Sequence, residues 1–310
     1  MGIIDLLAIG AIALDRIFEV DRLPTPYFEG IVQSFGNYFG GRAPNVAGMC
    51  ARLGLKTGIV SPVGKDFVSS GYKEHLERLG VDLRGVAYFP TEDTMQILIF
   101  TDPFGQQITF FYPGASMHFK DMGLPTHLIK ESRILHISSS GDPEFNIKCA
   151  ELAYDDHIPV SFDVGNDPSA EIPEYLRQLV RCTFFLFMND AEVDGVVQRL
   201  DLEKVQDLLD YGPKVVCVIS KKDKSSSIYS KNSVDHIHPK VLQVREPTGA
   251  SDGYVSGFLS AHVRGYRFRN AGMMGAAELT FIVENIGSQT NLPTWDSLCE
   301  RCKSLFTPLL

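Results

Sequence analysis

The chain has 310 residues, of which 44% are hydrophobic and 22% are charged, and its formal net charge at pH 7 is -9. This composition is typical of a globular protein and excludes a disordered chain or a fibrous repeat. The acidic balance argues against broad binding of nucleic acid or of an anionic membrane, because both require a basic face.

The N-terminal stretch, residues 1–15, is apolar but is interrupted by Asp5, and it is too short to span a bilayer. We therefore interpret it as a buried first strand. The six cysteines are scattered, mostly through apolar runs, and Cys299-x-x-Cys302 has no second pair that would complete a zinc site. We expect reduced thiols in a cytoplasmic protein.

Short apolar runs alternate with helical patterns over most of the chain. Strands are expected at residues 6–10, 57–63, 134–138, 159–163, 184–188 and 215–220. Helices are expected at residues 44–53, 69–79, 144–155, 173–180 and 203–209. The alternation predicts an α/β fold with a doubly wound, mainly parallel central sheet covered by helices on both faces. Ligands bind such sheets beyond the carboxyl ends of the strands.

Two segments interrupt the alternation, residues 11–38 and 93–112, and both contain extended runs rich in aromatic residues. We expect them to form a small separate sheet, leaving residues 1–10, 39–92 and 113–310 to the large domain. Because these segments leave or rejoin the main fold at the ligand edge, the small sheet should act as a lid. A lid that excludes water suits a transferase whose reaction competes with hydrolysis.

Residues 246–258 contain the strongest candidate for an anion site. A tight turn at Gly249 precedes a helix that should begin near Ala250 and end near residue 265. Unpaired N–H groups of Gly249, Ala250 and Ser251 would converge there, where the helix dipole favours negative charge, and Asp252 lies in the same turn. The alternative is an ordinary strand-to-helix turn with Asp252 as a capping residue.

Several motifs occur in a fixed order: Gly40-Gly-Arg-Ala-Pro-Asn-Val-Ala47, Ala51-Arg-Leu-Gly54, Val63-Gly-Lys-Asp66, Asn189-x-x-Glu192 and Pro247-Thr-Gly-Ala-Ser-Asp252. Together they resemble the ribokinase-like (PfkB) family of sugar and nucleoside kinases over essentially the whole chain. Further motifs make the chain most similar to the archaeal nucleoside kinases: Phe100-Thr-Asp102, Gln107-Ile-Thr-Phe-Phe111, Gly141-Asp-Pro-Glu-Phe-Asn146, Phe185-Leu-Phe-Met-Asn189 and Gln289-Thr-Asn-Leu-Pro-Thr-Trp-Asp296. No Gly-x-x-x-x-Gly-Lys-Ser/Thr loop occurs in the sequence, which excludes a P-loop kinase.

The resemblance implies a kinase that transfers the γ-phosphate of ATP to the 5′-hydroxyl of a ribonucleoside. It makes Asp252 the base that deprotonates the acceptor, and the amides of residues 249–252 an anion hole for the phosphoryl group. The implied substrate-binding residues are Asp15, Gly40, Gly41, Asn45 and Asp142. A turn acid at Asp15, a flexible turn at Gly40-Gly41 and an ordinary helix start at Asp142 remain alternatives.

Other polar and aromatic residues near the expected ligand edge also have two interpretations. Asp163 and Asn166 follow the strand at residues 159–163 and could be ligands or turn residues. The aromatic rings of Phe39, Phe110 and Phe111 could stack on a base or belong to the core of the lid.

For the donor, the resemblance implies a nucleotide site formed by Asn189, Ser220, Lys222, Thr248 and Asn285. Asn189 and Glu192 would also hold a hydrated Mg²⁺ and the phosphates, although a capping box explains that spacing equally well. The resemblance also allows a monovalent cation as a further cofactor.

Three features depart from the usual form of the family, at Glu246, at Ser251 and in the lysine-rich loop at residues 220–225. They predict altered binding of phosphate or of the donor, because Ser251 adds a Cβ where the backbone should approach phosphate. Two alternative functions remain: a sugar kinase of the ribokinase or fructokinase type, and a catalytically weakened nucleoside-binding protein. Apolar side chains exposed on the lid predict a homodimer joined through the lids.

Overall fold

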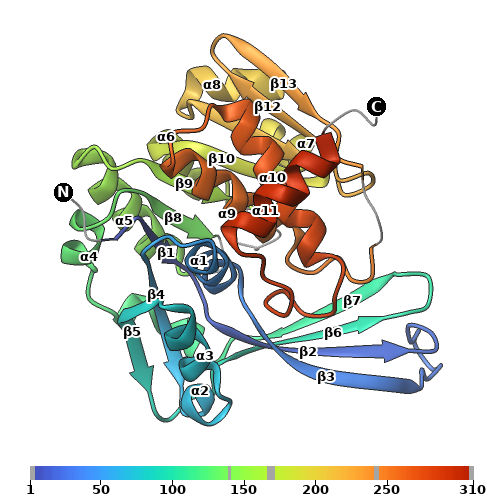
Figure 1. The fold of residues 1–310 in the computed structure, drawn as a ribbon. Helices are drawn as coiled ribbons and strands as arrows, with labels where there is room; N and C mark the ends of the chain where they lie inside the picture. The colour runs from blue at the N-terminus through green and yellow to red at the C-terminus, as the bar shows by residue number, and fades with distance from the viewer. Residues whose placement is uncertain (1–3, 139–140, 166–171, 241–243, 307–310) are drawn as a thin grey trace.

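A nine-stranded sheet forms the centre of the computed structural model, which describes residues 4–138, 141–165, 172–240 and 244–306 (Figure 1). Its strands lie side by side in the order β13 (Ser233–Ile237), β12 (Ser226–Ser230), β11 (Val215–Ile219), β10 (Thr183–Asn189), β9 (Val160–Asp163), β8 (Leu135–Ser138), β1 (Leu6–Ile9), β4 (Thr57–Gly64) and β5 (Asp82–Phe89). The pairings from β5 across to β11 are parallel, and the hairpin of β12 and β13 is added antiparallel. The expected α/β fold with a mainly parallel sheet is confirmed.

The inner strands are buried along their whole length because both of their faces are covered. Every residue of β1, β4, β8 and β9 is buried. Continuous apolar strands of this kind are typical of parallel sheets that lie between two helical layers. Since the strands are parallel, their carboxyl ends meet at one edge, which is where Asp163 and Asn189 lie.

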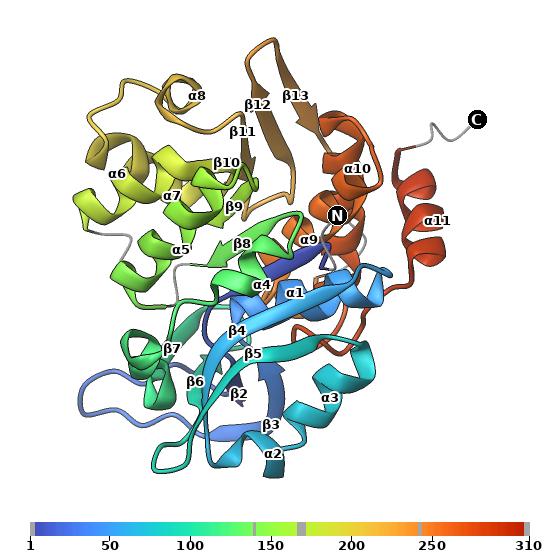
Figure 2. The ribbon, with the colours of Figure 1, turned by 90° about the vertical axis from the view of Figure 1, so that its left-hand side faces the viewer.

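Helices form one layer on each face of this sheet, as Figures 1 and 2 show. One layer and its apolar core contain α1 (Arg42–Arg52), α2 (Asp66–Ser69), α3 (Tyr72–Leu79), α9 (Ala250–Val263), α10 (Phe268–Ile282) and α11 (Trp295–Phe306). The other contains the 3₁₀ helix η1 (Gly114–Asp121), α4 (Thr126–Lys130), α5 (Pro143–Asp155), α6 (Pro173–Cys182), α7 (Asp190–Arg199), the 3₁₀ helix η3 (Val205–Asp207) and α8 (Leu208–Tyr211).

The small sheet has four strands in the order β3 (Val32–Gly40), β2 (Ala13–Val20), β6 (Met95–Thr101) and β7 (Gln107–Tyr112). Its strands run out from the body of the molecule at the lower right of Figure 1. Residues 11–38 and 93–112 therefore supply nearly all of this sheet, and β3 extends two residues further, to Gly40, two positions before the first residue of α1.

The two faces of the small sheet differ in character. Asp15 and Ile17 of β2 are buried, and the register places Ile99 of β6 opposite Ile17 on the same face. On the other face, Phe18 stacks on Phe100 with ring centroids 4.6 Å apart. The first face thus carries a buried carboxylate, and the second carries an aromatic row.

Most of the helices expected from the sequence are present, within a few residues of their expected bounds. The helix expected at residues 69–79 is divided, because Gly71 adopts a left-handed conformation between α2 and α3. The prediction of a single helix at residues 203–209 is wrong, because this part of the chain folds as η3 followed by the one-turn helix α8. Asn166 lies outside the described residues.

Within the described ranges, no helix has the length and apolar character needed to cross a membrane. All six cysteines are free thiols, and Cys50, Cys149 and Cys217 are buried.

Candidate active site

The candidate anion site begins with a glycine turn before α9. Gly249 has a φ of 82°, and a Cβ at this position would lie 2.6 Å from the Cβ of Ser288. A side chain at Gly249 would therefore be strained in its backbone and would collide with Ser288. This turn therefore requires glycine at position 249.

The first turn of α9 offers fewer free amides than expected. The N–H of Ala250 donates to the carbonyl oxygen of Pro247 at 3.1 Å, which closes the turn. The amides of Ser251 and Asp252 have no partner among the described residues. Since a helix N-terminus favours negative charge, these two N–H groups are available to an anion at this turn.

Asp252 is buried, and its environment brings the pKa of its carboxyl group close to neutral pH. Its Oδ2 accepts a hydrogen bond from Nδ2 of Asn45 at 2.7 Å. Burial raises the pKa of Asp252 to about 7, although the Arg42 guanidinium and the Asn45 hydrogen bond oppose this effect, while Asp163 adds to it. A carboxylate with such a pKa can accept a proton at neutral pH.

Asp15 and the two glycines before α1 form the second part of the site. Asp15 is buried, and its Oδ1 has no hydrogen-bond partner among the described residues. A Cβ on Gly40 would lie 2.0 Å from the Asp15 carboxylate, and one on Gly41 would lie 2.3 Å from the carbonyl oxygen of Ala11. Burial and the charges of Asp252 and Glu246 hold the pKa of Asp15 well above its usual range. The glycines thus make room for a carboxylate with an unused acceptor oxygen.

Three further side chains belong to this cluster, and the motif analysis assigned a site role to none of them. Gln289 Nε2 donates to Oδ1 of Asn45 at 2.8 Å and to the Tyr72 hydroxyl at 2.7 Å. The Oε1 of Gln289 lies 2.9 Å from Nε2 of His75. The one signal in the sequence was the motif that begins at Gln289, which carried no assigned role.

On the other side of the α9 turn lies a cavity of about 580 Å³. Among the residues that line it are six expected at the active site, namely Asn189, Ser220, Lys222, Thr248, Ala250 and Ser251. Gly105 and Gln107 of the small sheet line it as well. The first turn of α9 therefore presents Ala250 and Ser251 to the cavity and Asp252 to the cluster around Asn45.

Glu246, which stands where the family usually has Asp, organises the turn before α9. Its Oε1 accepts hydrogen bonds from the N–H and the hydroxyl of Thr248, at 2.9 and 2.5 Å. The same oxygen accepts a hydrogen bond of 3.2 Å from Nε2 of Gln107. Glu246 thus connects the small sheet to the loop that carries the anion site.

Asn189 and Glu192 form a capping box at the start of α7. Glu192 accepts hydrogen bonds from the backbone N–H and the Nδ2 of Asn189, at 2.9 and 2.5 Å. Burial and the neighbouring Asp163 raise the pKa of Glu192. Asp163 is itself paired with Arg42, whose Nη1 lies 3.1 Å from Oδ2 of Asp163. The capping interpretation of this pair is therefore correct, and it also places two carboxylates near one another at the sheet edge.

The remaining expected site residues lie at element ends. Asp142 caps α5, since its Oδ1 accepts the N–H of Phe145 at 2.9 Å. This bond is the one expected of an ordinary helix start. Asn285 follows α10 and is partly exposed, with its N–H directed to the carbonyl oxygen of Ile282 at 3.5 Å.

Residues 4–295 match the model of the pfkB family of carbohydrate kinases. The chain is 40% identical over 298 residues to a nucleoside kinase of Methanocaldococcus jannaschii, covering 96% of each chain. It is 37% identical over 289 residues to a nucleoside kinase of Methanothermobacter thermautotrophicus, covering 93% of this chain and 92% of that protein. The crystal structure of the Methanocaldococcus jannaschii nucleoside kinase, an archaeal member of the ribokinase family, superimposes with a TM-score of 0.90 at 39% identity, covering 98% of this chain and 99% of the other.

Proposed function

The chain belongs to the pfkB family of carbohydrate kinases, and from this premise we propose that it transfers the γ-phosphoryl group of ATP to the 5′-hydroxyl of a ribonucleoside. Kinases of this family are phosphotransferases with an alcohol acceptor. The nucleoside assignment rests on two relatives of 40% and 37% identity that are nucleoside kinases. The observation that carries the reaction is the buried Asp252, held by Asn45 in the first turn of α9.

Asp252 serves as the general base in this proposal. It follows Ser251, which lines the proposed donor cavity, and we therefore position it between donor and acceptor. Its carboxylate takes the proton of the attacking hydroxyl as the bond to phosphorus forms, while the turn N–H groups stabilise the charge of the phosphoryl group. Because burial raises the pKa of Asp252 to about 7, the active ionised form is lost as pH falls through that value.

The donor nucleotide fits the cavity of about 580 Å³ on the amide side of the turn. Ser220, Thr248 and the side chain of Lys222 line it, and Lys221 and Lys224 add positive charge. The lysine-rich loop thus supplies cations in place of the glycines that the family usually has there. Asn285 would complete this site from the end of α10.

Glu192 and Asp163 fit a divalent cation held through water. Both are buried carboxylates at the sheet edge, and burial raises the pKa of each, so a nearby cation would favour their ionised forms. Both oxygens of Glu192 already accept hydrogen bonds from Asn189, so Glu192 would contact a cation through water. Mg²⁺ suits this arrangement because it usually keeps several of its waters when bound. Bound Mg²⁺ would neutralise phosphate charge. In the same region Arg42 of this chain lies close to Asp163 and to Asp252.

The nucleoside would bind on the side of Asp15, Gly40, Gly41 and Asn45. The unpartnered Oδ1 of Asp15 can accept a hydrogen bond from a ribose hydroxyl. Both oxygen and nitrogen of the Asn45 amide are engaged, so this residue can offer its second N–H to the substrate. Asp142, at the start of α5, would lie at the outer limit of this site.

An aromatic side chain for stacking on the base is best sought on the inner face of the small sheet. Phe111 lies opposite Ile97, which in turn lies opposite Asp15, so the three share a face. Phe110 points to the opposite face, and Phe39 stacks on Tyr72 with ring centroids 4.5 Å apart. Phe111 is therefore our candidate among the three.

The small sheet would act as the lid of this site. Its link to the anion-site loop is the hydrogen bond from Gln107 to Glu246. A lid that closes over both substrates keeps water from competing with the acceptor hydroxyl. We further propose that the protein is a cytoplasmic homodimer joined through the aromatic faces of the two lids.

The proposal is tested by ADP release with ATP, Mg²⁺ and a panel of ribonucleosides, deoxynucleosides and free sugars. We expect turnover with ribonucleosides and a loss of kcat of at least about a hundredfold in Asp252→Asn, with little change in nucleoside binding. Asp210→Asn makes the same chemical change on the exposed surface of α8 and should retain full activity.

Each alternative corresponds to a different outcome of this assay. Turnover with ribose or fructose and not with nucleosides would reject the nucleoside assignment in favour of a sugar kinase. Nucleoside binding without any ADP release would indicate a binding protein in which Ser251 and the altered loops have weakened catalysis. A near-normal kcat in Asp252→Asn would remove Asp252 as the base.

A further inference from the structure

Gln289 connects the C-terminal part of the chain to the acceptor side of the site. Its Nε2 donates to Asn45 and to Tyr72, at 2.8 and 2.7 Å, and its Oε1 faces the ring nitrogen Nε2 of His75 at 2.9 Å. The Gln289 side chain is buried, and Tyr72 and Asn45 are buried around it. All polar atoms of this amide are thus engaged, which fixes its orientation.

These hydrogen bonds run in one consistent direction. Because Oδ1 of Asn45 accepts from Gln289, the Nδ2 of Asn45 is turned toward Asp252, to which it donates at 2.7 Å. The Tyr72 hydroxyl accepts from Gln289 and donates to the carbonyl oxygen of Gly40 at 2.8 Å. The Gln289 amide therefore orients Asn45, which bonds Asp252, and through Tyr72 it also contacts Gly40 on the proposed sugar side.

The reverse direction is incompatible with an ionised Asp252. If the Gln289 amide were turned around, Asn45 would have to turn as well and would place its Oδ1 against Oδ2 of Asp252. Two acceptor oxygens at hydrogen-bond distance repel each other unless the carboxyl group carries a proton. His75 opposes this reversal in the tautomer whose Nε2 carries the proton, because that nitrogen then donates to the oxygen of Gln289.

We propose that Gln289 is a positioning residue, which fixes the Asn45 amide so that Asp252 is held ionised and ready to accept the proton of the acceptor hydroxyl. This inference rests on the proposed role of Asp252. It assigns a purpose to the motif at residues 289–296, which has no evident use in a general α/β fold.

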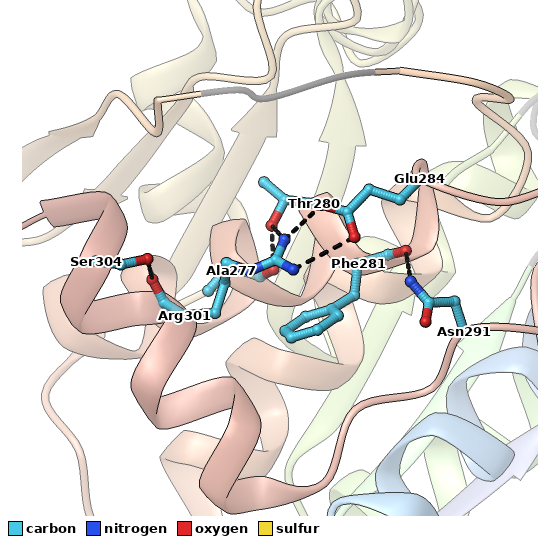
Figure 3. Close-up of polar contacts among 7 residues, drawn as sticks. All are labelled: Ala277, Thr280, Phe281, Glu284, Asn291, Arg301 and Ser304. Carbon is cyan, nitrogen blue, oxygen red and sulfur yellow. Dashed lines mark hydrogen bonds and ion pairs between the residues drawn. The ribbon is translucent and has the colours of Figure 1, made fainter.

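The segment that carries Gln289 is fastened on both sides, as Figure 3 shows for the contacts with α10 and α11. Asn291, two residues further, donates through Nδ2 to the carbonyl oxygen of Phe281 at 2.7 Å. Arg301 of α11 lies over the Phe281 ring and bonds Oε1 of Glu284 at 2.7 Å. The orientation of Gln289 is therefore set by a segment that is held at both ends.

Other groups also act on Asp252, and of these only the Tyr72 hydroxyl bonds Gln289 directly within the described residues. Arg42 of α1 favours its ionised form, whereas Asp163 at the end of β9 opposes it. Asp15 of β2 and the hydroxyl of Tyr72 also face it. A comparison of variants at Gln289 therefore isolates the contribution of the amide chain.

The test is the pH dependence of kcat in Gln289→Met, in the natural chain and in an Asn45→Ala background. Methionine has a similar length and no amide. We expect the midpoint of the acidic limb of the kcat profile to shift to higher pH by about one unit. At a pH on that limb, kcat should then fall about tenfold. In the Asn45→Ala background the same substitution should change kcat less than about twofold, because Gln289 acts through Asn45.

The matched control is Thr290→Val, in the same segment. The Thr290 hydroxyl bonds the carbonyl oxygen of Gly287 at 2.8 Å and takes no part in the amide chain. Thr290→Val should leave the acidic limb in place. A limb that stays in place in Gln289→Met, or equal losses of kcat in both backgrounds, would overturn the inference and leave Gln289 as a support of the fold.

A second measurement needs no turnover. The carboxyl infrared band that is present in the natural chain and absent from Asp252→Asn reports the titration of Asp252 directly. An upward shift of the titration midpoint in Gln289→Met supports the inference, whether or not the natural chain phosphorylates a nucleoside. If it phosphorylates none, only the proposed reaction is rejected. An unchanged midpoint rejects the inference while leaving the reaction intact.

Discussion

Two buried carboxyl groups on neighbouring helices have pKa values raised toward or above neutrality by burial. Asp252 on α9 reaches about 7 and has Asn45 as a donor, so its charge is partly compensated. Glu278 on α10 reaches about 8, and both of its oxygens lack a hydrogen-bond partner within the described chain. Asp252 is the base of the proposed reaction, whereas Glu278 lies in the core against Gly257, where a Cβ would be 2.9 Å from its Oε2.

The burial of Glu278 lowers the stability of the folded chain in a way that depends on pH. Between pH 4.5 and about 8 this group is protonated in the folded chain and ionised in the unfolded chain. The unfolded chain therefore binds fewer protons, and the free energy of unfolding should fall with rising pH by up to about 1.4 kcal/mol per unit from this group. Glu278→Gln should remove that slope, as measured by urea unfolding at several pH values across this range.

Glu300→Gln is the matched control for this measurement, because Glu300 is exposed on α11. It should leave the slope of the natural chain unchanged. If Glu278→Gln shows the same slope as the natural chain, Glu278 does not titrate as its burial implies.

At the scale of elements, α11 is attached to α10 through one cation. Arg301 bonds Oε1 and Oε2 of Glu284 at 2.7 and 3.3 Å and Thr280 at 3.1 Å, and its guanidinium lies 3.9 Å from the centre of the Phe281 ring. The side chains of Arg301 and Glu284 are 19% and 25% exposed, so this pair is shielded from much of the solvent. It is therefore worth more than a surface ion pair.

We expect Arg301→Met to lower the free energy of unfolding by about 2 kcal/mol, because Glu284 would lose its charged partner in a partly buried place. Chemical denaturation measures this loss. Lys231→Met, a cation-to-methionine change on the exposed turn between β12 and β13, should change stability by less than about 0.5 kcal/mol. Equal losses in the two variants would show that the contacts of Arg301 contribute nothing specific.

The sequence predicted those elements that carry their own periodicity. Strands such as β4 and β10 are continuous apolar runs that a buried parallel sheet requires, and α5 begins at a proline after a capping Asp142. The segment at residues 203–209 was mispredicted because its few apolar residues are compatible with any short turn of helix. The capping box at Asn189 was visible because it is local.

The site divides in the same way. Gly249 and Asp252 lie in one short motif, so their proximity follows from the sequence itself. The contacts of Tyr72, His75 and Gln289 join distant parts of the chain, and no local pattern announces them. A sequence motif can include such a residue, but it does not reveal the hydrogen-bond partners. Those partners follow from the packing of α1, α3 and the segment before α11.

At the scale of the whole molecule, the outer face of the small sheet exposes a row of aromatic side chains. Phe35, Phe18 and Phe100 lie opposite one another in register, and Phe110 packs edge-on against Phe100. The side chains of Phe35 and Phe110 are 67% and 59% exposed. An aromatic face of this kind is typical of a surface that a second copy covers.

We therefore expect light scattering to give twice the chain mass of 34.4 kDa. Replacing both Phe35 and Phe110 by serine should yield the monomer, because the substitutions remove the apolar area that drives association. Tyr154→Ser, at an exposed aromatic on α5, should remain dimeric. A natural chain that is monomeric at micromolar concentration would reject the dimer without affecting the assignment of the reaction.

The hydrogen bonds of Gln289 join residues 244 and 217 positions apart, so the acceptor side is closed by one of the last segments of the chain to be synthesised. During synthesis, the strands of the large sheet and α9 can assemble before this segment has emerged. The nascent protein then has its sheet and Asp252 but lacks the amide that contacts Asn45. The hydrogen bonds of this cluster can therefore form only after residue 289 has left the ribosome.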